Sequence, residues 1–185
     1  MSYKCIQKIL LHTYVIKVLP DGTFASITNK TIKIWKLNYD MIWECVQILN
    51  EHTSQIHCLL ILPDSTFASC STDTTIKIWK QNNGMVWKCI QTLIEHTDLV
   101  KCLTVLNDGT FVSCARNNTI KIWKQNDDMT WECAQTIIQY TFCQTYLTIL
   151  PDDTFCLHNK IFSTPYSIKR IKSKIIFNNV INALS

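Results

Sequence analysis

The chain has 185 residues, of which 47% are hydrophobic and 17% are charged. This balance predicts a folded domain with a core and excludes an intrinsically disordered chain. The formal net charge is +4, but residues 1–166 carry 14 basic and 14 acidic side chains, so the excess lies at the C-terminal end. A balanced body argues against a nucleic-acid-binding face.

The N-terminal sequence MSYKCIQKILLHT has no apolar stretch typical of a signal peptide. No run approaches the roughly 18 apolar residues that a membrane-spanning helix needs. We therefore expect a cytoplasmic protein with no membrane partner. Its ten cysteines are then expected to be free thiols in a reducing compartment.

A period of 44 residues runs through the chain. Two series of tryptophans show it: Trp35, Trp79 and Trp123, and Trp43, Trp87 and Trp131. Residues 43–86 and 87–130 are two nearly complete copies, a shorter copy precedes them, and a decaying fourth copy follows. Self-similarity at this period predicts a repeat architecture.

The copy that begins at Trp43 predicts short strands in chain order. The apolar run IHCLLIL over 56–62 is the first, PDST forms a turn, and TFASCS is the second. TDT then turns into TIKIWK, where Ile and Lys alternate with period two. After the loop QNNGM, the segment WKCIQTL over 87–93 is the fourth strand. Four strands in about 44 residues predict a propeller blade.

A four-stranded blade needs a similar blade on each side to bury its two faces, which explains why near-duplicate segments recur. The pairs expected to fill the same layer are Ile32/Ile34, Ile76/Ile78 and Ile120/Ile122. We predict an all-β fold, a propeller of about four four-stranded antiparallel blades that is incomplete or open. Residues 1–162 form the blades, and 163–185 form a basic tail that is either a strand closing the last blade or a short helix.

These residues resemble the WD-repeat family of β-propellers over about residues 1–162. The resemblance implies a hydrogen-bonded tetrad of His, Ser or Thr, Asp and Trp in each blade. The expected tetrad residues are His52, Ser69, Asp73 and Trp79 in one copy, and His96, Ser113, Asn117 and Trp123 in the next. Asn117 departs from the family pattern, which has Asp at this position, so only the first of these tetrads is complete.

No residue pattern predicts a cofactor, a metal site or catalysis. No C-x-x-C pair is present, and the cysteines recur at blade positions, which favours small strand residues over zinc ligands. Ser, His and Asp of the tetrad are the residue types of a hydrolase triad. However, tetrad groups are expected to be buried and hydrogen-bonded to one another, whereas a nucleophile needs an exposed site with an oxyanion hole. We therefore expect that the protein is not an enzyme.

The resemblance implies that binding occurs on loops at one end of the blades. The expected residues are Thr28, Gln55, Thr72, Leu99 and Arg116. We expect a non-enzymatic interaction module or scaffold with other proteins or peptides as partners, and with self-association through open blade edges. Two alternatives stay open: a substrate-recognition subunit of a larger complex such as a ubiquitin ligase, and a vestigial or purely structural repeat protein.

Overall fold

The computed structural model describes residues 15–138, 145–149, 155–159, 162–171 and 174–179. All regular structure in this part of the chain is β-strand. The strands form four antiparallel sheets of four strands each, and within each sheet the strands lie side by side in chain order. The predicted all-β fold of four-stranded blades is confirmed.

The bounds of the strands follow the predicted segments closely. Blade 1 contains β1 (Ile16–Val18), β2 (Phe24–Thr28), β3 (Thr31–Leu37) and β4 (Trp43–Leu49). Blade 2 contains β5 (Ile56–Ile61), β6 (Phe67–Ser71), β7 (Ile76–Gln81) and β8 (Trp87–Leu93). Blade 3 contains β9 (Val100–Val105), β10 (Phe111–Ala115), β11 (Thr119–Gln125) and β12 (Trp131–Ile138). Blade 4 contains β13 (Thr145–Ile149), β14 (Phe155–Asn159), β15 (Phe162–Ile171) and β16 (Lys174–Asn179).

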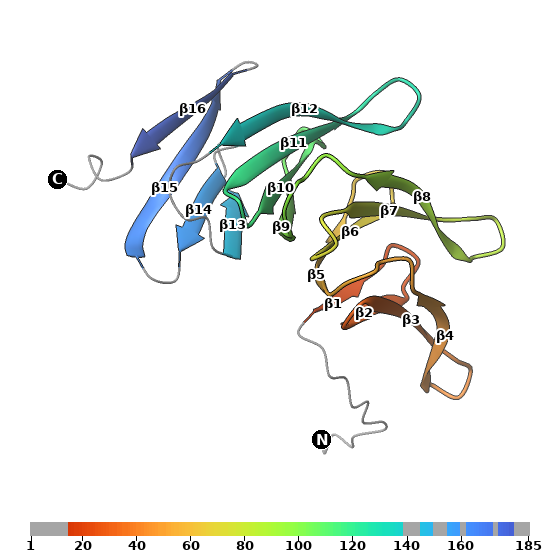
Figure 1. Cartoon of the computed structure of the whole chain (residues 1–185). Helices are drawn as coiled ribbons and strands as arrows, with labels where there is room; N and C mark the ends of the chain where they lie inside the picture. The colour runs from red at the N-terminus through yellow and green to blue at the C-terminus, as the bar shows by residue number, and fades with distance from the viewer. Residues whose placement is uncertain (1–14, 139–144, 150–154, 160–161, 172–173, 180–185) are drawn as a thin grey trace, which may run out of the picture.

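The four blades follow one another along an open arc, from β1–β4 in red and orange to β13–β16 in blue (Figure 1). The first strands of neighbouring blades contact one another, β1 with β5, β5 with β9, and β9 with β13. Within the described residues the arc does not close, because blade 1 and blade 4 lie at its opposite ends (Figure 1). The prediction of an incomplete or open propeller is confirmed.

The isoleucines of the third strands in blades 1 and 2 pack against aromatic side chains of the next blade. Ile32 and Ile34 of blade 1 lie in one buried cluster with Phe67, Trp79 and Trp87 of blade 2. The next interface repeats this arrangement: Ile76 and Ile78 of blade 2 cluster with Phe111, Trp123 and Trp131 of blade 3. All six of the predicted isoleucines are buried. Each contributes on the order of 2 kcal/mol when its side chain leaves water.

Polar side chains also join the blades at defined points. The Gln47 amide spans from blade 1 to blade 2, where it donates to the Trp87 carbonyl at 2.6 Å and accepts from the Trp87 N–H at 2.9 Å. Gln91 makes the same pair of bonds to Trp131, at 2.7 and 2.8 Å. In the opposite direction, Gln81 donates to Asp21 at 2.8 Å. The spacing of the blades is therefore fixed by hydrogen bonds as well as by apolar packing.

Blade 4 keeps the strand order but differs in sequence from the others. In blade 3 Phe111 faces Trp123 in register, whereas in blade 4 Phe155 faces Ile168. β15 and β16 occupy most of the C-terminal segment, so the segment contains strands, and the boundary predicted at 162/163 lies inside β15. Of the described residues, none forms a helix that would be long and apolar enough to cross a membrane.

Candidate functional site

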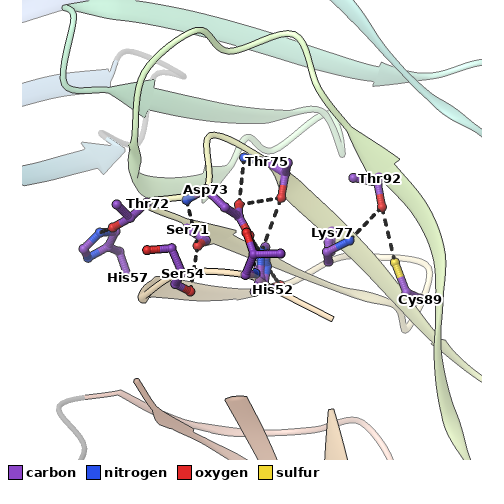
Figure 2. Close-up of polar contacts among 12 residues, drawn as sticks. His52, Ser54, His57, Ser71, Thr72, Asp73, Thr75, Lys77, Cys89 and Thr92 are labelled. Atoms are coloured by element: carbon purple, nitrogen blue, oxygen red, sulfur yellow. Dashed lines mark hydrogen bonds and ion pairs between the residues drawn. The ribbon is translucent and has the colours of Figure 1, made fainter. Parts of the chain in front are cut away.

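The structure brings His52, Ser69, Asp73 and Trp79 together in blade 2. His52 lies three residues beyond the end of β4, Ser69 is on β6, Asp73 is in the turn after it, and Trp79 is on β7. The His52 Nδ1 atom lies 2.7 Å from Asp73 Oδ2, and His52 Nε2 lies 2.8 Å from Ser69 Oγ. The Trp79 indole donates to the same Ser69 Oγ at 2.8 Å. Figure 2 shows Asp73 and Thr75 close to the His52 ring.

The carboxylate of Asp73 fixes the protons in this chain of hydrogen bonds. Because a carboxylate only accepts, Nδ1 of His52 carries the proton, and Nε2 then accepts from the Ser69 hydroxyl. Burial lowers the pKa of His52, and the Asp73 hydrogen bond opposes that shift. Burial raises the pKa of Asp73, but the bonds from Thr75 and His52 together outweigh it and lower the pKa. His52 is thus neutral and Asp73 is ionised at pH 7.

The Ser69–His52–Asp73 order is that of a hydrolase triad, but its surroundings do not allow nucleophilic attack. Ser69 has no exposed surface, and its oxygen already accepts from Trp79. A nucleophile must reach a substrate carbonyl beside oxyanion-stabilising donors. The arrangement instead ties four elements of blade 2 together inside the protein.

Blade 3 forms a different set of bonds because Asn117 does not reach His96. The Asn117 side chain donates to Thr97 at 3.0 Å and accepts from the Thr119 hydroxyl at 2.6 Å. The Thr119 oxygen, 3.2 Å from His96 Nδ1, takes the place of the carboxylate. His96 Nε2 still lies 2.6 Å from Ser113 Oγ.

Blade 3 lacks the carboxylate that opposes the effect of burial on the histidine pKa in blade 2. Burial and, to a smaller extent, the nearby Lys121 ammonium lower the pKa of His96 to about 4. Trp123 still donates to Ser113 at 2.8 Å, as Trp79 does to Ser69 in blade 2. In blade 1 Trp35 donates to Ser26 at 2.9 Å, while His12 lies outside the described residues.

The predicted binding loops lie together in pairs within each blade. The Thr72 N–H donates to the Gln55 carbonyl at 2.8 Å, and the Arg116 N–H donates to the Leu99 carbonyl at 2.9 Å. Thr28 lies beside Asn29, whose carbonyl accepts from the first residue of β5, so the blade 1 turn is tied to blade 2. Gln55 and Arg116 are exposed, and the other three residues are half-buried. These bonds hold the backbone of the five loops in place.

Two neighbours of these loops were not predicted from the sequence. His57 Nε2 lies 2.7 Å from the Thr72 hydroxyl (Figure 2). Asp98 faces the largely exposed Arg116 guanidinium, with Nε and Oδ2 3.3 Å apart. His57 also sits at a β-bulge, because Ile56 pairs with Ser71 and Cys58 with Cys70. The repeat is a signal for the place of His57, since Lys101 occupies the same bulge position in blade 3.

No group of three or more His, Cys, Asp or Glu residues suited to a metal ion occurs in the described part of the chain. Cys70, Cys102 and Cys114 are buried strand residues, as expected from their repeat positions. Cys45 is exposed on the outermost strand of blade 1, so not every repeated cysteine is buried.

Comparison with known proteins gives the family of the central repeats. The family model described as "WD domain, G-beta repeat" matches residues 43–80 and 87–124. Both segments are similar to WD40 repeats. Residues 43–80 run from β4 through β7, so this repeat supplies the outermost strand of blade 1 and three strands of blade 2. Each repeat thereby links two blades.

A solved structure with the same fold is the crystal structure of the WD40 β-propeller domain of Doa1. It superimposes with a TM-score of 0.63 at 22% identity over 78% of this chain. The match spans 47% of that domain, so the chain covers about half of its length. No curated protein matches the chain. WD40 domains generally serve as scaffolds for protein interactions.

Proposed function

We propose that this protein is a cytoplasmic, non-enzymatic scaffold that binds other proteins or peptides on the loops at one end of its blades. The loop set consists of Thr28, Gln55, Thr72, Leu99 and Arg116. The main support is the backbone pairing of Gln55 with Thr72 and of Leu99 with Arg116. A surface whose loops are already ordered loses little conformational entropy when a partner binds.

Arg116 is the residue on which we expect binding to depend most. Its side chain is 63% exposed, and its Nε lies 3.3 Å from Asp98 Oδ2. An exposed ion pair of this kind contributes little to stability, so its residues can change without unfolding the blade. Arginine is also enriched among the residues that dominate interface energies.

The test is affinity purification of the tagged full chain, comparing Arg116→Glu with the wild type. The control is Lys124→Glu, an exposed lysine on β11 of the same blade. We expect Arg116→Glu to lose a reproducible set of partners that Lys124→Glu retains. Identical partner sets for all three proteins would rule out this loop surface.

A second mode of association is favoured by the outer face of blade 1. Ile16 of β1 pairs in register with Ser26, as Leu59 pairs with Ser69 in blade 2. Leu59 is 1% exposed beneath blade 1, whereas Ile16 is 53% exposed. We propose that this apolar face supports self-association, because exposed apolar surface at a blade edge favours contact with another chain.

A further inference from the structure

Two cysteines face each other on neighbouring strands of blade 2. Cys58 on β5 and Cys70 on β6 are partners in register, directly after the β-bulge at His57. The side chains of such partners lie on the same face of the sheet, and their Cα atoms are about 4.5–5.5 Å apart. A disulfide spans about 4.4–6.8 Å between Cα atoms. The two strands therefore hold these thiols at a separation that a disulfide can bridge without a change of register.

The two thiols differ in their surroundings. Cys70 has no exposed surface and belongs to the buried cluster between blades 2 and 3. Cys58 is half-buried and packs against the same cluster, with its sulfur 3.9 Å from the Leu103 carbonyl oxygen of blade 3. A small molecule from solvent can therefore reach Cys58, whereas Cys70 is accessible to its neighbours inside the protein.

The pair is also chemically asymmetric. The hydrogen bond with Cys70 lowers the pKa of the Cys58 thiol to about 7 and more than offsets the opposite effect of burial. Burial raises the pKa of the Cys70 thiol well above its usual range. The thiolate is the form of cysteine that reacts as a nucleophile and is oxidised by peroxides. Cys58 is therefore the thiol that reacts first, and Cys70 is the protonated partner beside it.

We propose that Cys58 and Cys70 form a reversible oxidation site, at which a hydroperoxide such as hydrogen peroxide converts the two thiols to a disulfide. The Cys58 thiolate attacks one peroxide oxygen, the O–O bond breaks, and the leaving hydroxide takes up a proton to form water. Cys58 is then a sulfenic acid. The Cys70 sulfur attacks the Cys58 sulfur, the S–O bond breaks, and the hydroxyl group leaves with the Cys70 proton as a second water.

The balance of this reaction is complete. The two sulfurs together lose two electrons, and the peroxide gains them. A low-molecular-weight thiol such as glutathione reverses the reaction by attacking the disulfide and taking over its electrons' deficit as an oxidised thiol. Disulfides that form in a reducing compartment are usually transient and redox-sensing or catalytic, which fits a reversible site.

Blade 3 offers a comparison within the same chain. Cys102 and Cys114 are also partners in register next to a β-bulge, but both are buried, with 8% and 2% exposed surface. We therefore expect the blade 2 pair to oxidise first.

The experiment treats the reduced full chain with hydrogen peroxide, blocks the remaining thiols with iodoacetamide and maps the peptides by mass spectrometry. Cleavage before Asp64 places Cys58 and Cys70 on different peptides. We expect these peptides to be linked, with a mass two hydrogen atoms below their sum, and dithiothreitol to remove the link. Cys70→Ser should lose the link and leave Cys58 as a sulfenic acid that dimedone labels. Cys58→Ser should lose both the link and this label.

The control is Cys45→Ser, because Cys45 is exposed and precedes Cys58 on the same side of Asp64. We expect this variant to form the link with a yield within twofold of the wild type. Thermal melting of each reduced variant shows whether it is folded. Absence of the link in the peroxide-treated wild type would overturn the proposal, and so would its loss in folded Cys45→Ser. A link between Cys102 and Cys114 that forms equally fast would overturn the assignment of the site to blade 2.

Discussion

At the scale of single residues, blades 2 and 3 differ at one position with a large chemical effect. Asp73 accepts the hydrogen of His52 Nδ1. In blade 3, Asn117 instead bonds to Thr97, and the Thr119 oxygen lies beside His96 Nδ1. A hydroxyl oxygen stabilises a buried imidazole less than a carboxylate does, because it carries no charge. The two histidines therefore occupy similar places in different electrostatic surroundings.

Asn117→Asp should restore the missing carboxylate. We expect its oxygens to accept from His96 and Thr119, which raises the pKa of His96 and stabilises the fold by about 1–2 kcal/mol. Urea unfolding measures the stability, and an NMR titration of the imidazole measures the pKa. Asp73→Asn is the reciprocal control and should destabilise by a similar amount. An Asn117→Asp protein no more stable than the wild type would contradict this account.

The low pKa of His96 makes stability depend on pH. The pKa is about 4 in the folded protein and near 6.5 in the unfolded chain. Between these values the unfolded chain binds a proton that the folded protein does not, so the stability present above pH 6.5 falls as pH drops towards 4. This histidine accounts for a loss on the order of 3 kcal/mol. Burial shifts His52 and His57 in the same direction.

The check is the free energy of unfolding measured at steps from pH 7.5 to pH 4. His96→Gln removes the group that titrates and keeps a side chain able to bond Ser113. We expect a visibly shallower pH dependence in this variant. The same slope in both proteins would show that the loss of stability comes from other groups.

At the scale of strands and blades, the glutamines of the outermost strands make the same hydrogen bonds at two successive blade interfaces. Gln91→Ala deletes both bonds to the backbone of Trp131 and leaves that backbone unpaired. We expect a destabilisation of about 1–3 kcal/mol in urea unfolding. Gln55→Ala, at an exposed position in a loop, is the control and should change stability by less than about 0.5 kcal/mol. Equal effects would contradict a bridging role for Gln91.

Much of the arrangement of strands and blades was predictable from the sequence. The alternation in TIKIWK and the apolar run IHCLLIL predicted β7 and β5 to within one or two residues. The 44-residue period then predicted that the isoleucine pairs fill the same layer in successive blades. The Gln91–Trp131 bonds were not predictable, because the acceptor and donor are backbone groups 40 residues away. The role of Thr119 was also missed, since a tetrad template assigns that place to residue 117.

At the scale of the whole molecule, the two segments that match the WD40 model form the centre of an arc, and Ile16 on the first blade of this arc is 53% exposed. We expect the chain to associate as its concentration rises, and Ile16→Glu on this blade to reduce that association. Size-exclusion chromatography with light scattering measures the mass across a dilution series. Lys17→Glu, one residue along β1, is the control for added charge. A monomer at every concentration would contradict self-association through blade 1.

The central claim is that consecutive blades stack face to face, and it places Asp21 of blade 1 against Gln81 of blade 2. A double-mutant cycle of Asp21→Ala and Gln81→Ala, measured by urea unfolding, tests this directly. We predict a favourable coupling of about 0.5–1.5 kcal/mol between residues 60 positions apart. Strictly additive effects of the two substitutions would contradict the stacking of blades 1 and 2.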